Sequence, residues 1–257
     1  MEISRRSLVK GIAQGLPLAT ILADPMLARA VAAGLETVSL TTAGGRKVTA
    51  ALALPQKTPA HAILLIHENR GLKDEIKAVA AEFAKDGYVA LAIDLFNGKL
   101  ASTTDEANAL MAAFDPKAAL DILVSWIDWL KKNPRTNGRV ATIGWCFGGG
   151  WSLNASLAVP VNATVIYYGN VKKTAAELAP LKGPVLMHYG LKDKFITTAM
   201  VDGFKAAAKE AHKNVTVYAY ADANHAFANP TGAAYPYVKD AADLAWKRTL
   251  AFLKKYD

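Results

Sequence analysis

Short apolar runs alternate along this 257-residue chain with longer stretches that mix apolar and polar positions. Val140–Ile143 is a short apolar run, whereas Val215–Tyr220 alternates in the manner of a half-buried strand. We expect strands near residues 36–42, 47–54, 61–66, 88–93, 139–144, 162–168, 184–189 and 215–220. We expect helices near residues 74–86, 103–113, 116–132, 147–157, 198–211 and 237–255.

The order of these elements predicts the fold class. Two early strands are followed by repeated strand–helix alternation, which predicts an α/β fold with a mostly parallel central sheet, an antiparallel start and helices on both faces. Hydrophobic residues make up 52% of the chain, as such a doubly covered sheet requires. Asp74 and Glu75 favour a helix start, and Gly87 favours its end.

Residues 144–150 read Gly-Trp-Cys-Phe-Gly-Gly-Gly and directly follow a predicted strand. This is the G-x-nucleophile-x-G pattern of a strained strand-to-helix turn, with Cys146 where serine is usual. The following helix would aim its free N–H groups at a thiolate or an oxyanion. The alternative is a buried, inert cysteine. A phosphate loop is disfavoured because no lysine follows Gly150, and the dinucleotide pattern is not met.

An acid and a base follow the cysteine in the chain order of this fold. Asp193 comes after the predicted strand at 184–189, and His225 comes after the strand at 215–220. Both residues therefore lie beyond the carboxyl ends of strands, where open parallel sheets place their chemistry. The alternatives are a turn or helix-cap role for Asp193 and a surface-loop position for His225.

With these motifs the chain resembles the dienelactone hydrolase family over most of residues 35–255. The resemblance rests on residues 144–149, on Asp193, on His225 followed by Ala-Phe, and on the segment Ile66–Leu72. It implies an α/β-hydrolase fold with Cys146, Asp193 and His225 as catalytic residues. It also implies that Glu68 contacts the cysteine and promotes thiolate formation, and that the N–H groups of Asn69 and Phe147 form the oxyanion hole.

Three assignments within this site stay open at the level of sequence. Glu68 either accepts the thiol proton or pairs with Arg70. Trp145 either lines a substrate pocket or packs in the core. Asn229, a possible substrate-pocket residue, stands four residues after His225, where the resemblance implies an arginine that grips a substrate carboxylate.

The chain has no arginine between Gly71 and Pro134 either, where the second such arginine is expected. Lys99 is the alternative cation. Because arginine is hard to replace at a bidentate site, we expect a neutral ester or lactone as substrate.

The N-terminus reads as an export signal. Arg5 and Arg6 precede a moderately apolar stretch, and the small-residue pattern Ala28-Arg29-Ala30 follows. We expect residues 1–30 to be a twin-arginine signal peptide, recognised by the twin-arginine export machinery, and residues 34–257 to form the hydrolase domain. The enzyme would then be periplasmic or secreted. The alternative is an amphipathic N-terminal helix.

Several other classes are disfavoured. The net charge is +8, but the lysines are scattered, so we expect no nucleic-acid partner. No apolar run reaches 18 residues, so we expect no stable membrane insertion. No cofactor or metal motif is complete, since Gly71 interrupts H-E-x-x-H. The expected function is ester or lactone hydrolysis through an acyl-enzyme. Alternatives are a thioesterase or cysteine peptidase on the same fold, or a non-catalytic periplasmic binding protein.

Overall fold

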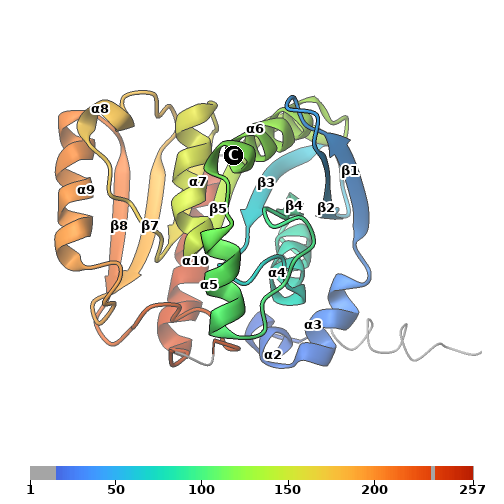
Figure 1. The fold of residues 1–257 in the computed structure, drawn as a ribbon, viewed down its shortest axis with the longest axis horizontal. Helices are drawn as coiled ribbons and strands as arrows, with labels where there is room; N and C mark the ends of the chain where they lie inside the picture. Colours follow the sequence, from blue (N-terminus) through green and yellow to red (C-terminus); the bar gives the residue numbers. More distant parts are fainter. Residues whose placement is uncertain (1–15, 233–234, 257) are drawn as a thin grey trace, which may run out of the picture.

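The structure, a computed structural model, describes residues 16–232 and 235–256 and contains one eight-stranded sheet in the order β1-β2-β4-β3-β5-β6-β7-β8 (Figure 1). The strands are β1 (Glu36–Thr41), β2 (Lys47–Ala53), β3 (Ala60–Ile66), β4 (Val89–Ile93), β5 (Thr136–Trp145), β6 (Ala163–Tyr167), β7 (Val185–Gly190) and β8 (Val215–Tyr220). Only β1–β2 and β2–β4 pair antiparallel. The expected mostly parallel sheet with an antiparallel start is confirmed.

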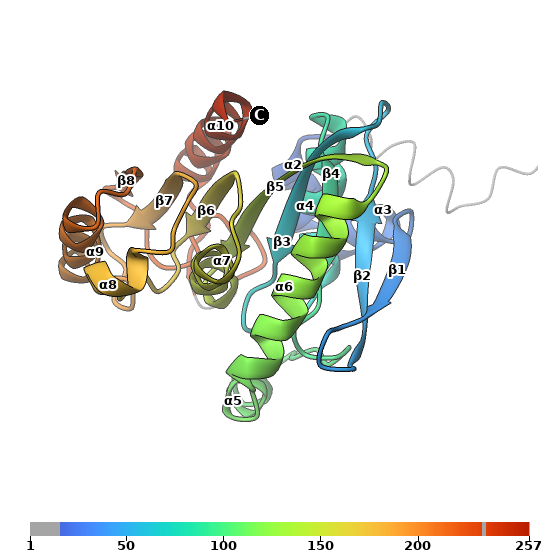
Figure 2. The same cartoon turned by 90° about the horizontal axis from the view of Figure 1, so that it is seen from above.

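Helices cover both faces of the sheet. They are α2 (Leu18–Ala23), α3 (Pro25–Ala32), α4 (Asp74–Lys85), α5 (Thr104–Ala112), α6 (Pro116–Lys132), α7 (Phe147–Ala158), α8 (Ala175–Leu178), α9 (Thr198–Glu210) and α10 (Lys239–Lys255). Figure 2 shows α6 and α7 on one face and α10 on the other. Helix α4 lies on the α10 face, because the rings of Phe83 and Trp246 pack 4.6 Å apart between these two helices.

The inner strands are continuous apolar runs because both of their faces are covered. All residues of β4 and β6 are buried, as are the last five residues of β3. This burial fixes the carboxyl ends of β3, β5, β7 and β8 along one edge of a rigid sheet. The loops at that edge carry the residues singled out by the motifs.

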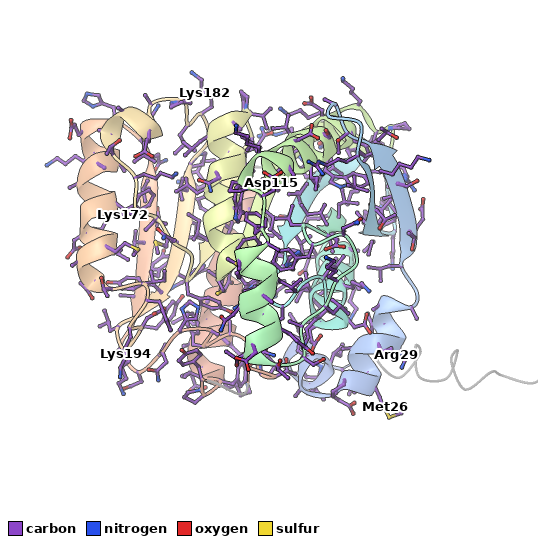
Figure 3. All side chains as sticks on the ribbon, viewed as in Figure 1. Met26, Arg29, Asp115, Lys172, Lys182 and Lys194 are labelled. Carbon is purple, nitrogen blue, oxygen red and sulfur yellow. The ribbon has the colours of Figure 1, made fainter. Side chains whose placement is uncertain are left out.

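Sequence patterns did not indicate α2, α3 or α8 as part of the folded body. Helix α3 begins at an Asp24–Pro25 start, where the Asp24 side chain accepts hydrogen bonds from the N–H groups of Met26 and Leu27. Helices α2 and α3 form a helical hairpin, the α2–α3 hairpin, which buries Ile21 and Ala28 in the same core cluster as Phe83 of α4. Figure 3 shows Met26 and Arg29 on its outer side.

This hairpin contains the expected cleavage pattern, Ala28-Arg29-Ala30, within α3. Arg5 and Arg6 lie outside the described residues, so the export signal stays a prediction. In the part of the chain that the structure describes, no helix is both long enough and apolar enough to cross a membrane. The lysines labelled in Figure 3, Lys172, Lys182 and Lys194, lie at separate places on the side of the molecule that carries α8 and α9.

Candidate active site

Cys146 stands at the turn between β5 and α7, with backbone angles of φ 54° and ψ −114°. This left-handed φ is strained for a residue with a side chain, and it persists because the surrounding backbone leaves no alternative. A Cβ at Gly144 would overlap the Gly148 carbonyl, and a Cβ at Gly148 would overlap the carbonyl oxygens of Ile66 and His67. The glycines of the motif therefore let α7 start directly against the end of β3.

His225 joins the cysteine to the acid. Its Nε2 lies 3.1 Å from the Cys146 sulfur, and its Nδ1 lies 2.8 Å from Asp193 Oδ2. A carboxylate only accepts hydrogen bonds, so Nδ1 carries a proton and Nε2 faces the sulfur. The three residues expected from the motifs are thus brought into one hydrogen-bonded chain. His225 is buried rather than on the surface.

Asp193 has a turn role as well as its contact with the histidine. Its Oδ1 accepts hydrogen bonds from the N–H groups of Phe195 and Ile196, at 2.8 and 2.9 Å. These bonds orient the carboxylate so that Oδ2 points at His225. The turn contacts and the contact with His225 therefore occur together, because the turn is what positions the carboxylate.

The electrostatics of this hydrogen-bonded chain favour the charged form of His225. Burial lowers the pKa of His225, but hydrogen bonds to Asp193 and Cys146 outweigh it and raise that pKa to about 10. Burial raises the pKa of Asp193, but the hydrogen bonds from His225, Ile196 and Phe195, together with attraction to the His225 charge, outweigh it, so the net shift is downward. The carboxyl is therefore ionised beside an imidazolium at neutral pH.

Glu68 follows β3 and is held by neutral partners. Its Oε2 accepts a hydrogen bond of 2.6 Å from the Asn229 side-chain amide, and its Oε1 accepts one of 3.5 Å from the Tyr168 hydroxyl. Arg70 does not pair with it, because that guanidinium donates to the Ser102 carbonyl at 2.7 Å. Burial, only partly offset by the Asn229 bond, raises the pKa of Glu68.

Among the described residues, Glu68 forms no hydrogen bond with Cys146, although such a contact was expected. Both carboxyl oxygens are directed instead at Asn229 and Tyr168. Asn229 occupies the position where an arginine was expected, so an amide replaces a cation next to the glutamate. The physical consequence is a carboxyl that lacks an ionic hydrogen-bond partner.

The N–H groups expected to form the oxyanion hole lie at the junction of β3 and α7. Phe147 is the first residue of α7, and Asn69 lies three residues beyond β3. Within residues 16–232 and 235–256, neither backbone N–H donates to a protein acceptor. Free donors at a helix start beside a thiol are what a developing oxyanion needs.

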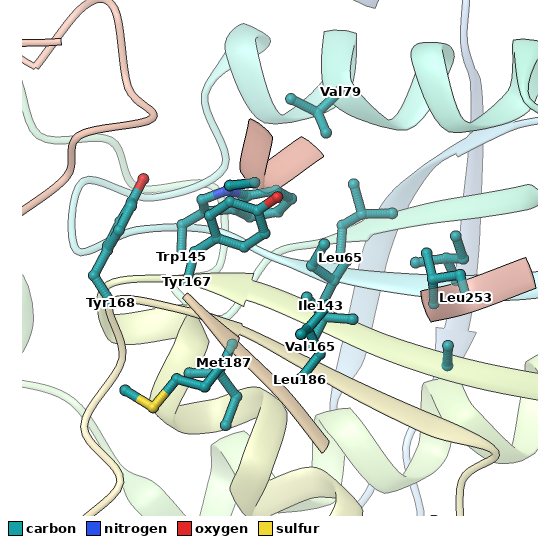
Figure 4. Packing of buried hydrophobic residues seen from close by; sticks show 14 of the residues in the cluster. Leu65, Val79, Ile143, Trp145, Val165, Tyr167, Tyr168, Leu186, Met187 and Leu253 are labelled. Atoms are coloured by element: carbon teal, nitrogen blue, oxygen red, sulfur yellow. The ribbon is translucent and has the colours of Figure 1, made fainter. Parts of the chain in front are cut away.

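Trp145 is a core residue rather than a pocket wall. Its side chain is buried, and its ring packs 5.6 Å from the Tyr167 ring (Figure 4). Strand alternation explains this, because successive side chains along β5 point to opposite faces of the sheet. The ring of Phe147 packs instead against Phe96 and Phe114.

Aromatic residues that sequence patterns left unassigned surround His225. Tyr168, Phe195 and Tyr235 all place their rings within 5.7 Å of the imidazole. Phe195 is 57% exposed, so it presents an apolar surface at the edge of the site. Tyr168 has a positive φ of 39°, and its place at the end of a strand was the only signal in the sequence.

Lys99 is separate from these groups. It lines a cavity of about 410 Å³ together with Arg46, Phe96 and Phe114, and neither Cys146 nor His225 borders that cavity. No group of three or more His, Cys, Asp or Glu residues suited to a metal ion occurs within the described ranges.

Known proteins resemble this chain over nearly its whole length. The model of the dienelactone hydrolase family matches residues 48–257. The chain is 28% identical to a carboxymethylenebutenolidase of Pseudomonas putida over 232 residues, covering 85% of this chain and 95% of that one. It is 32% identical to the protein usf of Aquifex pyrophilus over 224 residues, covering 82% and 95%.

A solved dienelactone hydrolase-like promiscuous phosphotriesterase from metagenomic libraries shares the fold, with a TM-score of 0.78. Its sequence is 19% identical, and the match covers 86% of this chain and 98% of that one. With the fold and the family match in agreement, the chain belongs to the dienelactone hydrolase family and is an enzyme of the carboxylic ester and lactone hydrolase class.

Proposed function

We propose that the enzyme hydrolyses neutral esters or lactones through a thioester on Cys146. The observation that carries the proposal is the chain of hydrogen bonds from the Cys146 sulfur to His225 and on to Asp193. A nucleophile, a base and an orienting acid in this geometry are the requirements of acyl transfer.

In the first half-reaction the Cys146 thiolate attacks the carbonyl carbon while its proton resides on His225. The oxyanion accepts hydrogen bonds from the N–H groups of Phe147 and Asn69, and each such donor is typically worth about 3–4 kcal/mol. Collapse of the tetrahedral intermediate breaks the C–O bond, and the imidazolium protonates the leaving alkoxide. The acyl group then remains on sulfur.

In the second half-reaction His225 takes a proton from water, and the resulting hydroxide attacks the thioester. The second tetrahedral intermediate expels the thiolate and releases the carboxylic acid. The proton held on the imidazole restores the starting pair. Asp193 keeps Nδ1 protonated throughout, so that Nε2 always faces the reacting atoms.

The test is a panel of p-nitrophenyl esters, lactones and thioesters assayed with wild type, Cys146→Ala and Cys146→Ser. Cys146→Ala should retain less than about a hundredth of the wild-type kcat, because losing a triad nucleophile costs at least that factor. Cys146→Ser should also be poor, because a hydroxyl needs stronger activation by a base. Mass spectrometry of rapidly quenched wild type should detect the acyl-enzyme.

Activity of Cys146→Ala near the wild-type level would refute the nucleophile assignment. A thioester preference across the panel would identify a thioesterase instead. A wild-type protein inert to the whole panel, with a thiol that reacts with iodoacetamide as an ordinary cysteine does, would favour a binding protein.

We also propose that the protein is exported by the twin-arginine route to the periplasm or beyond. Support comes from Arg5, Arg6 and the Ala28-Arg29-Ala30 pattern in the sequence. That route carries folded proteins, which is consistent with a hydrolase whose site needs the complete sheet.

A further inference from the structure

His67 is a buried polar residue to which the proposed chemistry assigns no role. It directly follows β3, and its ring is fully buried between Phe96 and Phe147, with ring centroids 4.9 and 6.0 Å away. A buried imidazole needs partners for both nitrogens, because each unsatisfied polar group is costly. Its partners are what connect it to the site.

Both ring nitrogens of His67 contact the backbone of loops at the catalytic edge. Nδ1 lies 2.6 Å from the carbonyl oxygen of Glu68, and Nε2 lies 3.0 Å from the N–H nitrogen of Leu95. The Leu95 N–H is a donor, so Nε2 is the acceptor. The proton therefore sits on Nδ1 and is donated to the Glu68 carbonyl.

The carbonyl of Glu68 belongs to the same peptide unit as the N–H of Asn69. A trans peptide is planar, so its C=O and N–H point in opposite directions. Whatever holds the Glu68 carbonyl therefore also aims the Asn69 N–H, one of the two oxyanion donors. If this peptide flipped, it would present an oxygen to the oxyanion instead of a hydrogen.

Resting on the proposed acyl-transfer function, we propose that His67 is a positioning residue that holds the Glu68–Asn69 peptide in the orientation of a working oxyanion hole. The N–H of Gly71 also reaches the Glu68 carbonyl, at 3.3 Å, and so helps to close the turn. The His67 bond is the shorter of the two. It comes from a ring that aromatic packing and Leu95 prevent from rotating.

The neighbouring contacts agree with this role. Asp94 Oδ1 lies 3.7 Å from His67 Nε2, and the Asp94 carboxylate accepts hydrogen bonds from the N–H groups of Phe96 and Gly98. Asp94 thereby shapes the loop that presents the Leu95 N–H. The loop after β4 thus orients the His67 ring through the Leu95 N–H, and the ring in turn orients the Glu68 carbonyl in the loop after β3.

Three variants separate the two contacts of the ring. His67→Phe removes both bonds and keeps an aromatic ring. His67→Asn places an amide near the Nδ1 position, so it keeps a donor for the Glu68 carbonyl. His67→Gln reaches the Nε2 position and keeps an acceptor for Leu95. His188→Phe is the matched control, because His188 is equally buried but bonds Tyr220 and Thr249 away from the elbow.

Three readouts are needed. The first is kcat for a p-nitrophenyl ester that the wild type cleaves. The second is the rate of Cys146 alkylation by iodoacetamide, a displacement reaction that forms no oxyanion. The third is the affinity for a trifluoromethyl ketone, which forms a tetrahedral oxyanion on the cysteine. The melting temperature of each variant shows whether it is folded.

We expect His67→Phe and His67→Gln to lower kcat and ketone affinity by at least about tenfold, a fraction of the effect of losing a whole oxyanion donor. Alkylation should stay within about twofold of wild type, because the pair of Cys146 and His225 is untouched. His67→Asn should keep kcat within about threefold of wild type. His188→Phe should lower the melting temperature while kcat changes less than about twofold.

Retention of wild-type kcat and ketone affinity by folded His67→Phe or His67→Gln would overturn the proposal. So would an active Gln variant beside an inactive Asn variant, since the Leu95 contact would then be the important one. If His67→Phe does not fold, the Asn and Gln pair decides. A wild type that cleaves no ester, or cleaves it without Cys146, refutes the proposed function instead.

Discussion

Glu68 is a buried carboxyl whose hydrogen-bond partners, Asn229 and Tyr168, are both neutral. A cation at position 229 would stabilise its ionised form, whereas an amide does so only weakly. Burial therefore raises the pKa of this carboxyl. An amide in place of the expected arginine therefore leaves Glu68 without a cationic hydrogen-bond partner among the described residues.

Glu68→Gln tests the charge state through stability. A carboxyl with a higher pKa in the folded than in the unfolded state binds more protons when folded, so the free energy of unfolding falls as pH rises above its ordinary pKa of 4.5. Glutamine does not ionise, so the Glu68→Gln variant does not lose this part of the free energy of unfolding as pH rises. The melting temperature of Glu68→Gln relative to wild type should therefore increase as pH rises above 4.5.

Glu177→Gln is the control of opposite sign. Hydrogen bonds from the Thr174 N–H and hydroxyl lower the pKa of Glu177, so its ionised form adds stability above its ordinary pKa. The melting temperature of this variant relative to wild type should fall as pH rises toward 4.5, and at higher pH the difference should stay constant. A Glu68→Gln curve that runs parallel to wild type would show that Glu68 is ionised in the folded protein.

Asn229 leads to a prediction about substrate charge. A carboxylate buried without an ionic partner costs several kcal/mol. We expect kcat/KM for the methyl ester of a carboxylate-bearing lactone to exceed that for the free acid by about tenfold or more, roughly 1.4 kcal/mol. Asn229→Arg should narrow the gap, and Lys99→Ala should leave it unchanged. A tenfold preference of wild type for the acid would contradict the prediction.

At the scale of elements, the site depends on how closely α7 approaches the end of β3. The first turn of α7 has a glycine where its backbone passes the carbonyls of Ile66 and His67, which brings the start of α7 next to the loop that follows β3. Cys146, at the turn just before α7, adopts its strained backbone conformation beside these closely packed segments.

Gly148→Ala should therefore be strongly destabilising. Its Cβ would overlap two backbone carbonyl oxygens, which cannot move aside as a flexible side chain can. We expect a loss at or above the usual cost of overpacking, about 1–3 kcal/mol, in denaturant unfolding. Gly203→Ala in α9 is the control, because nothing lies near its Cβ position. It should gain about 0.5–1 kcal/mol from helix propensity. Equal effects of the two changes would refute the close approach.

At the scale of the whole molecule, the α2–α3 hairpin is integrated into the core that covers α4. Ile21 and Ala28 are 2% and 0% exposed, so the hairpin contributes apolar burial that the domain beginning near Gly34 would lack. Export with cleavage after Ala30 would remove most of this contribution. The exported enzyme would then be the less stable form.

Two chains test this point, one beginning at Leu16 and one at Gly34. Burial of an Ile or Leu side chain is worth about 1.5–3 kcal/mol, so loss of Ile21 and Leu22 should lower the melting temperature of the shorter chain by several degrees. Both chains should hydrolyse the same ester, because the hairpin contributes no side chain to the described site. Equal melting temperatures would show that the hairpin does not stabilise the domain.

The export signal has its own test at this scale. Changing Arg5 and Arg6 to lysine should leave the precursor in the cytoplasm, and N-terminal sequencing of the exported wild type should begin near Val31. A periplasmic protein that still begins at Met1 would contradict the expected signal.

The sequence by itself determined the sheet, its mostly parallel order and the positions of Cys146, Asp193 and His225. Periodicity, glycine spacing and chain order are local properties, and carboxyl ends of parallel strands meet at one edge whatever the side chains do. The need for glycine at positions 144 and 148 could also be predicted from the sequence motif, and the structure shows that the turn leaves no room for a Cβ there.

Only the tertiary structure decided which partners the polar side chains take. Glu68 bonds Asn229 across 161 residues of chain rather than its neighbour Arg70, and Trp145 faces the core. His67 and the α2–α3 hairpin gain their roles from segments remote in sequence. Burial and hydrogen-bond partners depend on which segments meet in space, and a pattern read along one chain does not contain that information.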